Sequence, residues 1–218
     1  MQNETPLVSV IFVTYNRPYT LVATFESFLA LTDYPRSRLE LIVADDGSDL
    51  DAREFIRRMK FDIHLLGPRN RGLGANMNQG LRAASGDLIL VLQDDWLCVG
   101  PSDYLRRCVS LLMSEPDIGL VSALDWGDRV VEERRMSPAG EAVVLSPRDG
   151  VGAPARVYSD NPHLKRRDFH HIVGWYAEGV PMTIMENRMN LAVGAQSRYR
   201  AALIPNLRPF VHIGDAYS

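Results

Sequence analysis

The sequence predicts an α/β fold, in which a mostly parallel mixed sheet is flanked by helices and followed by a less regular C-terminal half. Short apolar runs alternate with helical patterns through residues 1–124, which is how parallel strands and their crossover helices appear in a sequence. The chain has 218 residues, of which 46% are hydrophobic and 23% charged, so it can bury one substantial core. We therefore expect residues 1–124 and 125–218 to be two halves of one domain.

Apolar periodicity assigns the elements of the first half. Val8–Thr14 is a continuous run rich in β-branched residues, as in a buried strand, and Leu21, Phe25 and Phe28 share one face of the helix that follows. The predicted strands are Val8–Thr14, Leu39–Ala44, Ile63–Leu66, Leu88–Leu92 and Ile118–Leu124. The predicted helices are Arg17–Leu31, a segment after Asp49, Leu73–Ala84 and Pro101–Met113.

The second half carries weaker signals. Arg129–Arg135 and Glu141–Leu145 flank a turn sequence and predict a hairpin. The stretch Ser146–Arg167 contains prolines and glycines without a strong period, and it is expected to be a mobile loop. A helix is expected at Met182–Val193 and a last strand at Tyr199–Ile204.

Charge and cysteine content exclude several classes of protein. The net charge of −3 provides no basic field for a nucleic-acid backbone, and the two lysines, Lys60 and Lys165, lie outside any G-x-x-x-x-G-K-[ST] phosphate loop. Cys98 and Cys108 lack the spacing of a zinc or disulfide framework and are expected to be reduced thiols. No apolar run approaches the roughly 20 residues that cross a bilayer, so we expect a cytoplasmic protein without a transmembrane segment.

Polar side chains follow four of the predicted strands, at residues 14–17, 45–48, 67–72 and 93–96. In open parallel sheets the ligand lies beyond the carboxyl ends of the strands, so we expect these side chains to share one crevice. At about 4 Å and an effective dielectric near 20, each acidic pair there would repel by roughly 4 kcal/mol. Carboxylates favour Mg²⁺ or Mn²⁺, which share their coordination with substrate phosphates. The pattern therefore predicts a divalent cation and a nucleoside diphosphate.

Each of these acidic strings also has an ordinary structural interpretation. Asp45-Asp46-Gly47-Ser48 is more often a turn with an aspartate cap, and Asp94-Asp95 could cap the start of a helix. Only their place after buried strands favours the ligand site.

Four strings in register resemble glycosyltransferase family 2. They are Val8-Ser9-Val10-Ile11-Phe12-Val13-Thr14-Tyr15-Asn16-Arg17, Val43-Ala44-Asp45-Asp46-Gly47-Ser48, Asn70-Arg71-Gly72 with Asn78-Gln79-Gly80, and Ser85-Gly86-Asp87 leading to Gln93-Asp94-Asp95. The match covers about residues 7 to 100. The resemblance implies the GT-A fold, a nucleotide-sugar donor, a divalent cation and inversion at the anomeric carbon.

The resemblance also implies roles for individual residues. Those that would bind the nucleotide are Val13, Tyr15, Arg17, Asn70, Gly72, Asp46 and Asp94. Asp46 would accept from the ring N–H of the base, which favours uracil or thymine, with UDP slightly preferred, and Asp94 would lie near the ribose and phosphates. Asp95, the last acid of the family's DXD element, would bind Mn²⁺ or Mg²⁺. Gln93 stands at the first position of that element, where the family has an aspartate.

An inverting transfer needs a base for the acceptor hydroxyl. In the family this is an acid at the start of a late helix, often in a Glu-Asp pair, and Glu186 occupies that place. Asn187 stands where many members have the aspartate. Competing candidates are Glu178, Asp125 and Asp168, and a helix-start carboxylate is the structural alternative for Glu186.

Several other side chains allow two interpretations. His212 resembles a late family histidine that approaches the metal, and a packing role is the alternative. Lys165-Arg166-Arg167 is read first as a solvated charge run, with closure over the donor phosphates as the alternative. Trp126 and Trp175 could stack on acceptor sugars, although core packing is commoner.

The sequence thus predicts an inverting glycosyltransferase that moves a sugar from a nucleoside diphosphate, with UDP preferred, to a saccharide or other hydroxyl acceptor. Two alternatives stay open: a sugar-nucleotide pyrophosphorylase, and a non-catalytic module that binds nucleotide sugars or glycans. Residues 14–18 lack the glycine and lysine of a pyrophosphorylase loop. Gln196–Arg200 does not complete the Q-x-x-R-W element of processive synthases, so single-sugar addition is favoured.

Overall fold

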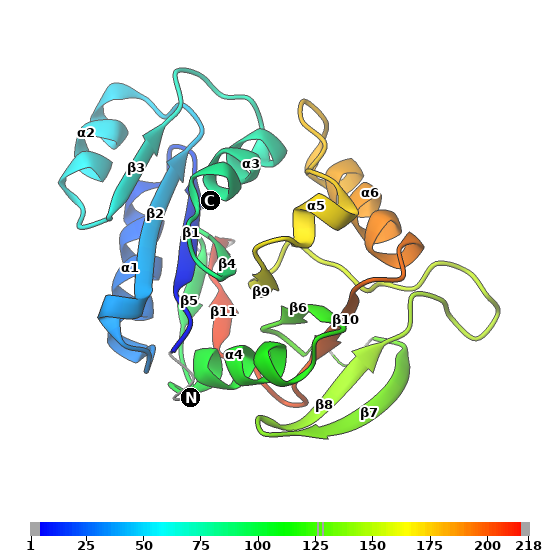
Figure 1. The fold of residues 1–218 in the computed structure, drawn as a ribbon. Coiled ribbons are helices and arrows are strands. Elements are labelled where there is room, and N and C mark those ends of the chain that lie inside the picture. The colour runs from blue at the N-terminus through cyan, green and yellow to red at the C-terminus, as the bar shows by residue number, and fades with distance from the viewer. Residues whose placement is uncertain (1–4, 126, 128, 215–218) are drawn as a thin grey trace.

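One nine-stranded mixed sheet forms the centre of the protein (Figure 1), in the order β3-β2-β1-β4-β9-β6-β10-β8-β7. The computed structural model describes residues 5–125, 127 and 129–214. The strands of this sheet are β1 Val8–Thr14, β2 Leu39–Asp45, β3 Ile63–Leu66, β4 Leu88–Gln93, β6 Ile118–Ser122, β7 Val131–Ser137, β8 Gly140–Leu145, β9 His163–Arg166 and β10 Arg200–Leu203. A separate two-stranded sheet pairs β5 (Trp96–Cys98) with β11 (Phe210–His212).

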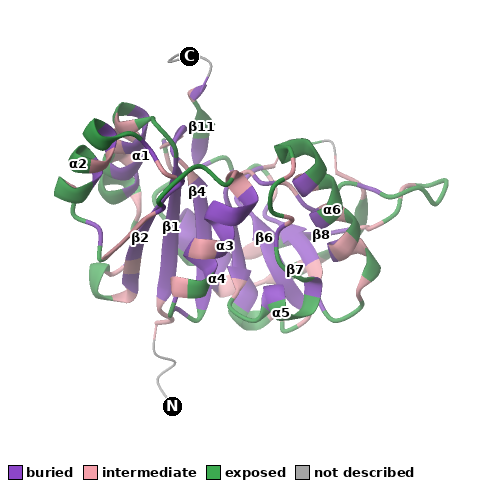
Figure 2. Ribbon diagram, turned by 90° about the horizontal axis from the view of Figure 1, so that it is seen from above, coloured by how far each residue is buried: buried purple, intermediate pink, exposed green. Residues whose placement is uncertain are grey.

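Helices cover both faces of the large sheet. They are α1 Pro18–Leu31, α2 Leu50–Arg58, α3 Leu73–Ala83, α4 Tyr104–Ser114, α5 Phe169–Val173 and α6 Met182–Ala195, with a short 3₁₀ turn at Arg36–Arg38. Alternate residues of β1 enter two separate cores, because side chains alternate across a strand: Phe12 packs with α1, α2 and α4, and Ile11 packs with α3, α5 and α6. The central strands are buried along their length and the outer helix faces are exposed (Figure 2).

The direction of the strands brings several strand ends to one edge. β1 pairs in parallel with both β2 and β4, and β2 pairs in parallel with β3. β9 runs antiparallel to both β4 and β6, so β6 points the same way as β4. The carboxyl ends of these parallel strands therefore open at the same edge, and the predicted mixed, mostly parallel α/β fold is confirmed.

The second half departs from the sequence prediction at β9. The loop expected over Ser146–Arg167 contains this strand, which lies between β4 and β6 in the middle of the sheet. The run Lys165-Arg166-Arg167 is consequently not a solvated loop: Lys165 is fully buried, and the Arg166 guanidinium donates to backbone carbonyls around the end of α4. The sequence interpretation failed because four apolar or long side chains cannot establish a strand period on their own.

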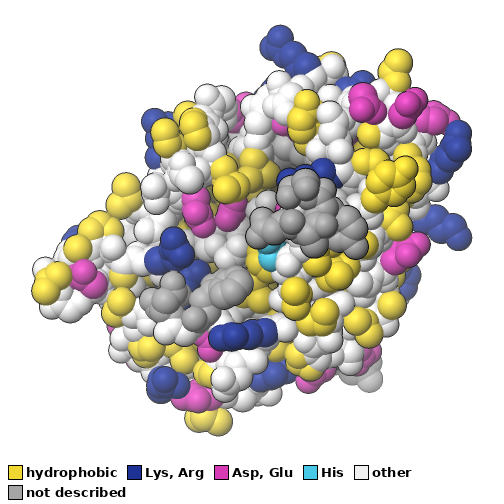
Figure 3. All heavy atoms as spheres, turned by 180° about the vertical axis from the view of Figure 1, so that it is seen from behind, with side chains coloured by type: hydrophobic (Ala, Val, Ile, Leu, Met, Phe, Trp, Pro, Cys, Tyr) yellow, Lys and Arg dark blue, Asp and Glu magenta, His cyan; other side chains and the backbone are white. Residues whose placement is uncertain are grey.

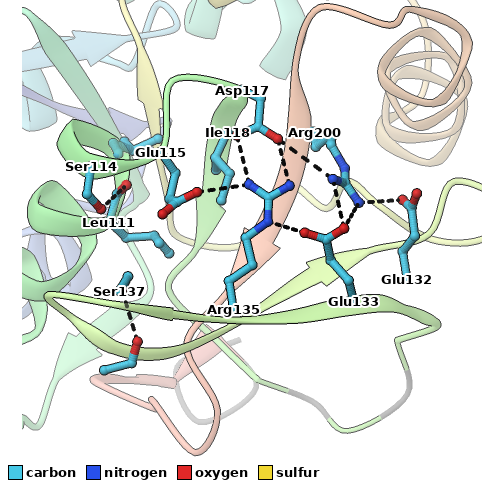
Figure 4. A network of polar contacts seen from close by, with 12 residues as sticks. Leu111, Ser114, Glu115, Asp117, Ile118, Glu132, Glu133, Arg135, Ser137 and Arg200 are labelled. Atoms are coloured by element: carbon cyan, nitrogen blue, oxygen red, sulfur yellow. Dashed lines mark hydrogen bonds and ion pairs between the residues drawn. The ribbon is translucent and has the colours of Figure 1, made fainter.

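The hairpin predicted after residue 125 is confirmed as β7 and β8, and a network of charged side chains fixes it to the sheet (Figure 4). Arg135 on β7 makes a two-pronged contact with Asp117, at 2.8 and 2.9 Å, and a further one with Glu115 at 2.9 Å. Arg200 on β10 reaches Glu132 at 3.0 Å. β7 is the edge strand at this end of the sheet, and its charged side chains are a common protection against pairing with another chain.

The cysteine prediction is confirmed and the surface shows no dominant charge. Cys98 and Cys108 are free and buried. The face seen in Figure 3 carries arginines and acidic side chains interspersed, without one continuous basic surface. No helix within the described ranges 5–125, 127 and 129–214 combines the length and the apolar character that a membrane crossing requires.

Candidate active site

The carboxyl ends of β1, β2 and β4 and the start of α3 enclose a cleft of 270 Å³. The seven residues proposed from the sequence for nucleotide binding all line it: Val13, Tyr15, Arg17, Asp46, Asn70, Gly72 and Asp94. Sheet register explains the convergence, because Thr14 lies opposite Asp45 on β2 and Val13 lies opposite Gln93 on β4. Residues 80 positions apart in the sequence, such as Val13 and Gln93, therefore meet where the carboxyl ends of the strands open.

The two adjacent aspartates after β2 have different surroundings. Asp45 is completely buried and accepts hydrogen bonds from the backbone and hydroxyl of Ser48, so it builds the turn. Asp46 faces the cleft, and its two oxygens accept the backbone N–H groups of Arg71 at 2.9 Å and Gly72 at 2.8 Å. Burial raises the pKa of Asp46, and the two N–H donors oppose that shift. Each oxygen retains a second lone pair for a ligand donor.

A second acidic pair follows β4. The Thr14 hydroxyl donates to Asp94 at 2.7 Å, inside the protein. The Arg17 guanidinium lies 2.8 Å from the Asp95 carboxylate and 3.8 Å from that of Asp94. Burial, followed by the charge of Asp95, raises the pKa of Asp94 to about 6, while the Thr14 hydroxyl lowers it. Arg17 therefore supplies part of the positive charge that the acidic pair was expected to need.

The small β5–β11 sheet, which the sequence did not indicate, brings His212 beside Asp95. Nε2 of His212 lies 3.3 Å from the carboxylate of Asp95, and the other oxygen of Asp95 is buried with no hydrogen-bond partner among the described residues. A buried carboxylate oxygen without a donor is costly, and such an oxygen fits a Mn²⁺ or Mg²⁺ ion. The adjacent imidazole nitrogen would be a further ligand. Within the described residues no three His, Cys, Asp or Glu side chains gather as a complete metal site, so an ion here would need ligands from a bound diphosphate or water.

Glu186 lies one turn into α6, and a short chain of hydrogen bonds connects it to the donor side. Its carboxylate accepts the backbone N–H of Asp160 at 3.2 Å. The side-chain amide of Gln93 donates to the carboxylate of Asp160 at 3.2 Å and to its carbonyl at 3.3 Å. The candidate base is thus connected through Asp160 to the residue that precedes Asp94 and Asp95.

The three competing bases have other partners. Glu178 forms an ion pair with Arg71 at 2.7 Å on the exposed surface. Asp125 accepts the backbone N–H groups of Gly127 and Asn206 and so shapes its own loop. Asp168 accepts the Tyr199 hydroxyl at 2.8 Å, and it follows β9, which runs away from the carboxyl end of β4. Glu178 also approaches the donor cleft, because the backbone N–H of its partner Arg71 donates to Asp46, but both of its carboxylate oxygens are already bound, by Arg71 and by the Asn78 amide.

A buried polar cluster lies between the sheet and α5. The Lys165 amine donates to the Tyr176 hydroxyl at 2.9 Å and lies 3.3 Å from Nε2 of His163. Burial lowers the pKa of Lys165 well below its usual value, and it lowers that of His163 to about 3 and that of His170 to about 2. Both histidines are therefore neutral at physiological pH, burial disfavours the charged form of Lys165, and this buried amine has no place in closing a loop over phosphates.

The two tryptophans considered for sugar stacking have different outcomes. Trp126 lies outside the described residues. Trp175 is half-exposed, with the Arg82 guanidinium 4.9 Å from its ring centre and the His170 ring stacked at 5.9 Å.

Residues 9–177 match the sequence profile of Glycosyl transferase family 2. The chain belongs to this family. A relative with a long alignment is the succinoglycan biosynthesis protein ExoM of Rhizobium meliloti, which is 28% identical over 184 residues, or 82% of this chain and 49% of ExoM.

Solved structures of family-like enzymes share the fold. The mannosyltransferase PcManGT of Pyrobaculum calidifontis, in complex with GDP-Man and Mn²⁺, superposes with a TM-score of 0.69 at 20% identity and covers 94% of this chain and 56% of its own. S. aureus TarS 1-349 in complex with UDP-GlcNAc gives 0.67 at 16% identity, covering 97% of this chain and 62% of that one. These likenesses show the GT-A fold. The alignments span between about a third and a half of the length of three curated relatives, ExoM among them.

Two polar residues of this family 2 site were missed in the sequence. Asn76, in α3, donates to the carbonyl of Ala44 at 2.8 Å, and its own carbonyl oxygen is buried without a partner and borders the cleft. Its position on a helix that begins beside the cleft was a usable signal. Asp160 lies in the stretch expected to be a loop, and nothing in its neighbourhood of the sequence indicated that it would meet both Gln93 and Glu186.

Proposed function

We propose that this chain transfers a glycosyl unit from a nucleoside diphosphate sugar to an acceptor hydroxyl, with inversion and with the help of a divalent cation. The observation that supports this most is the single cleft formed by the seven candidate nucleotide-binding residues, beside Asp95 and His212. Membership in glycosyltransferase family 2 agrees with it. Residues 1–124 would then hold the donor and residues 125–218 the acceptor.

On the donor side the protein would bind and orient the nucleotide. Asp46 would accept the ring N–H of uracil, which makes UDP the preferred nucleotide, while Asp94 would approach the ribose and Arg17 the diphosphate. Asp95 and His212 would hold the Mn²⁺ or Mg²⁺ ion, which, when bound, would neutralise charge developing on the departing diphosphate. Arg17 would exchange its contact with Asp95 for one with phosphate oxygens.

On the acceptor side Glu186 would act as the general base. It would take the proton of the acceptor hydroxyl while that oxygen forms a bond to the anomeric carbon. The bond from the anomeric carbon to the diphosphate oxygen breaks, and its electron pair leaves with the nucleoside diphosphate. A single displacement from the opposite face inverts the configuration at that carbon.

The test combines binding and turnover on the whole chain. A thermal-shift series with UDP, GDP, dTDP and their sugars, each with and without Mn²⁺, should give the largest rise in Tm for UDP compounds with Mn²⁺. A ligand at a hundredfold excess over its Kd stabilises the folded state by about 2.7 kcal/mol. Release of the nucleoside diphosphate from its sugar then reports transfer to water or to an added acceptor.

Variants distinguish the proposed site from general effects. Asp95→Ala should abolish the Mn²⁺-dependent part of the shift, whereas Asp33→Ala, on a residue paired with Arg106 outside the cleft, should leave it unchanged. The proposal is wrong if no nucleotide raises the Tm. Binding without release of the diphosphate would instead favour the non-catalytic module.

A further inference from the structure

The chain departs from the family pattern at two places, and Asp160 contacts the region of both. Gln93 replaces the first aspartate of the DXD element, and Asn187 replaces the second acid of the Glu-Asp pair. Asp160 accepts the amide of Gln93 and lies against Glu186, the neighbour of Asn187. An aspartate at position 93 would place a second carboxylate against that of Asp160, and like charges in such contact repel. Gln93 is therefore the residue type that suits this neighbour.

The position of Asp160 is fixed by α6. Glu186 and Asn190 stand one turn apart on this helix, where side chains four residues apart share a face. The Asn190 carbonyl oxygen accepts the backbone N–H groups of Val157 and Tyr158, at 2.8 and 3.0 Å, and Glu186 accepts that of Asp160. These contacts hold the segment before β9 in register with the helix, and they direct a nearly buried Asp160 toward Glu186.

The Asp160 carboxylate accepts a hydrogen bond from the Gln93 amide and lies beside another carboxylate, that of Glu186. Gln93 faces it from β4, Glu186 from α6, and Tyr158 and Tyr176 lie close enough to be affected by its charge. Burial raises the pKa of both tyrosines, so they stay neutral, and burial lowers the pKa of the Lys165 amine that donates to Tyr176. Burial raises the pKa of Asp160 to about 6, and the charge and hydrogen bond of Glu186 add to this shift.

We propose that Asp160 is a positioning residue for the acceptor-side base, replacing the carboxyl that the family pattern has at position 187. This inference rests on the proposed function of Glu186. When Glu186 takes the proton of the acceptor hydroxyl, the protonated acid donates a hydrogen bond to the ionised carboxylate of Asp160. The pair then holds the proton while the electron pair of the broken glycosyl bond leaves on the diphosphate.

Proton uptake by Asp160 gives this arrangement a pH dependence. Above about pH 6 Asp160 is ionised and can accept from the protonated Glu186. Below that pH Asp160 is protonated and donates to Glu186 instead, which occupies the lone pair that the base needs. Turnover should therefore fall on the acid side with a midpoint near pH 6 in the native chain.

Carboxyl NMR titration of protein labelled with ¹³C on aspartate and glutamate tests the pairing directly and requires no substrate. The native chain should show a carboxyl titrating near pH 6 that is absent in Asp160→Asn. Asp94, expected near the same pH, remains in that variant as an internal reference. Glu186→Gln should lower the midpoint of Asp160 by about one pH unit, because a neighbouring negative charge is removed. Gln93→Leu should raise it, because a hydrogen-bond donor to the carboxylate is lost.

The outcomes separate this proposal from the proposed function. An Asp160 that titrates near the ordinary pKa of about 4, or that Glu186→Gln leaves unmoved, overturns the pairing whatever the activity. Glu186 is a half-buried helix residue, so we expect Glu186→Gln to fold. The change in the Asp160 midpoint in this variant tests the pairing even if Asp160→Asn does not fold.

Turnover supplies the second readout. With a sugar nucleotide that the native chain consumes, Asp160→Asn should slow release of the diphosphate about tenfold at neutral pH, with KM unchanged. The acid limb near pH 6 should become shallower, because only Asp94 then titrates there. An unchanged acid limb in a folded variant would show that Asp160 serves the structure alone. A chain that consumes no sugar nucleotide contradicts the proposed function, and the titration still decides whether the two carboxyls are paired.

Discussion

The donor side and the acceptor side of the candidate site hold their carboxylates in different ways. Asp46 and Asp94 are held by backbone N–H groups and a buried hydroxyl from adjoining strand ends. On the acceptor side, Glu186 accepts the backbone N–H of Asp160 and the Asp160 carboxylate accepts the side-chain amide of Gln93, so these contacts join segments that meet only in the folded chain. Contacts between adjoining strand ends follow from the sheet register, whereas the contact between Gln93 and Asp160 depends on two particular side chains. Gln93 and Asn187, the two departures from the family pattern, both lie beside this second group of contacts.

The largest effect is expected from the acceptor-side base. Glu186→Gln should lower turnover by about 10²- to 10⁴-fold, which is the usual contribution of a general base, and should leave the nucleotide-induced rise in Tm intact. Glu178→Gln is the matched control, because Glu178 is tied to Arg71 at the surface and its loss should change turnover little. Equal losses in both variants would remove the distinction between the two glutamates. Single-turnover release of the diphosphate is the measurement.

On the donor side, Asp46→Ala should weaken nucleotide binding by about tenfold or more. The base loses a hydrogen bond to a charged acceptor, worth about 1.5 to 3 kcal/mol, and the backbone N–H groups of Arg71 and Gly72 lose the same acceptor. Asp49→Ala removes the cap of α2, where Asp49 accepts the Ala52 N–H at 2.9 Å. Asp49→Ala should cost about 1 kcal/mol in the free energy of unfolding without weakening nucleotide binding. Calorimetric titration with UDP and Mn²⁺ compares the affinities of the two variants. Equal affinities would mean that the nucleotide base does not contact Asp46.

The buried amine of Lys165 should make stability depend on pH. Its pKa is lowered well below the usual value in the folded chain, so between that value and about pH 10.4 the unfolded state binds one more proton than the folded state. Stability contributed at this site therefore rises by about 1.4 kcal/mol per pH unit over that range. Lys165→Met should lose this slope, whereas exposed Lys60→Met should keep it. Urea unfolding from pH 7 to 9 measures the difference, and identical slopes would mean a charged amine.

The smallest effect is expected at the hairpin. Arg135→Ala removes a two-pronged contact with Asp117 and a contact with Glu115, with about a fifth of the arginine side chain exposed. We expect a loss of about 1 to 2 kcal/mol in the free energy of unfolding. Arg134→Ala, on the same strand but with an exposed partner, should cost about 0.5 kcal/mol or less. A larger loss from Arg134 would show that the network in Figure 4 does not anchor the hairpin.

The donor side could be predicted from the sequence because each of its polar groups follows a run that is recognisable as a strand. Thr14 ends β1, Asp46 and Asp94 stand directly after β2 and β4, and parallel pairing brings such positions together. The strand pattern alone could not separate Asp45 from Asp46, because which of two adjacent side chains faces the turn depends on the local backbone; the resemblance to the family supplied that distinction.

The acceptor side was predicted only in part because its elements are short and pair over long distances. The helix that carries Glu186 is long enough to be expected from the sequence, but the four residues of β9 and the three each of β5 and β11 are not. Their pairing is decided by the strands that they join. Burial of Lys165 and the contact of Asp160 with Glu186 follow from that pairing, so neither could be derived from neighbouring residues.

The place of β9 also constrains how the chain can reach its native state. β4 and β6 both end before residue 124. Each pairs with β9, which begins at His163 and lies between them. When only the first half of the chain has been synthesised, β4 and β6 each have an edge without its partner strand. Unpaired strand edges promote association between nascent chains. We expect the first half, expressed by itself, to accumulate as insoluble material, and a peptide or second fragment that supplies the missing strand to restore it.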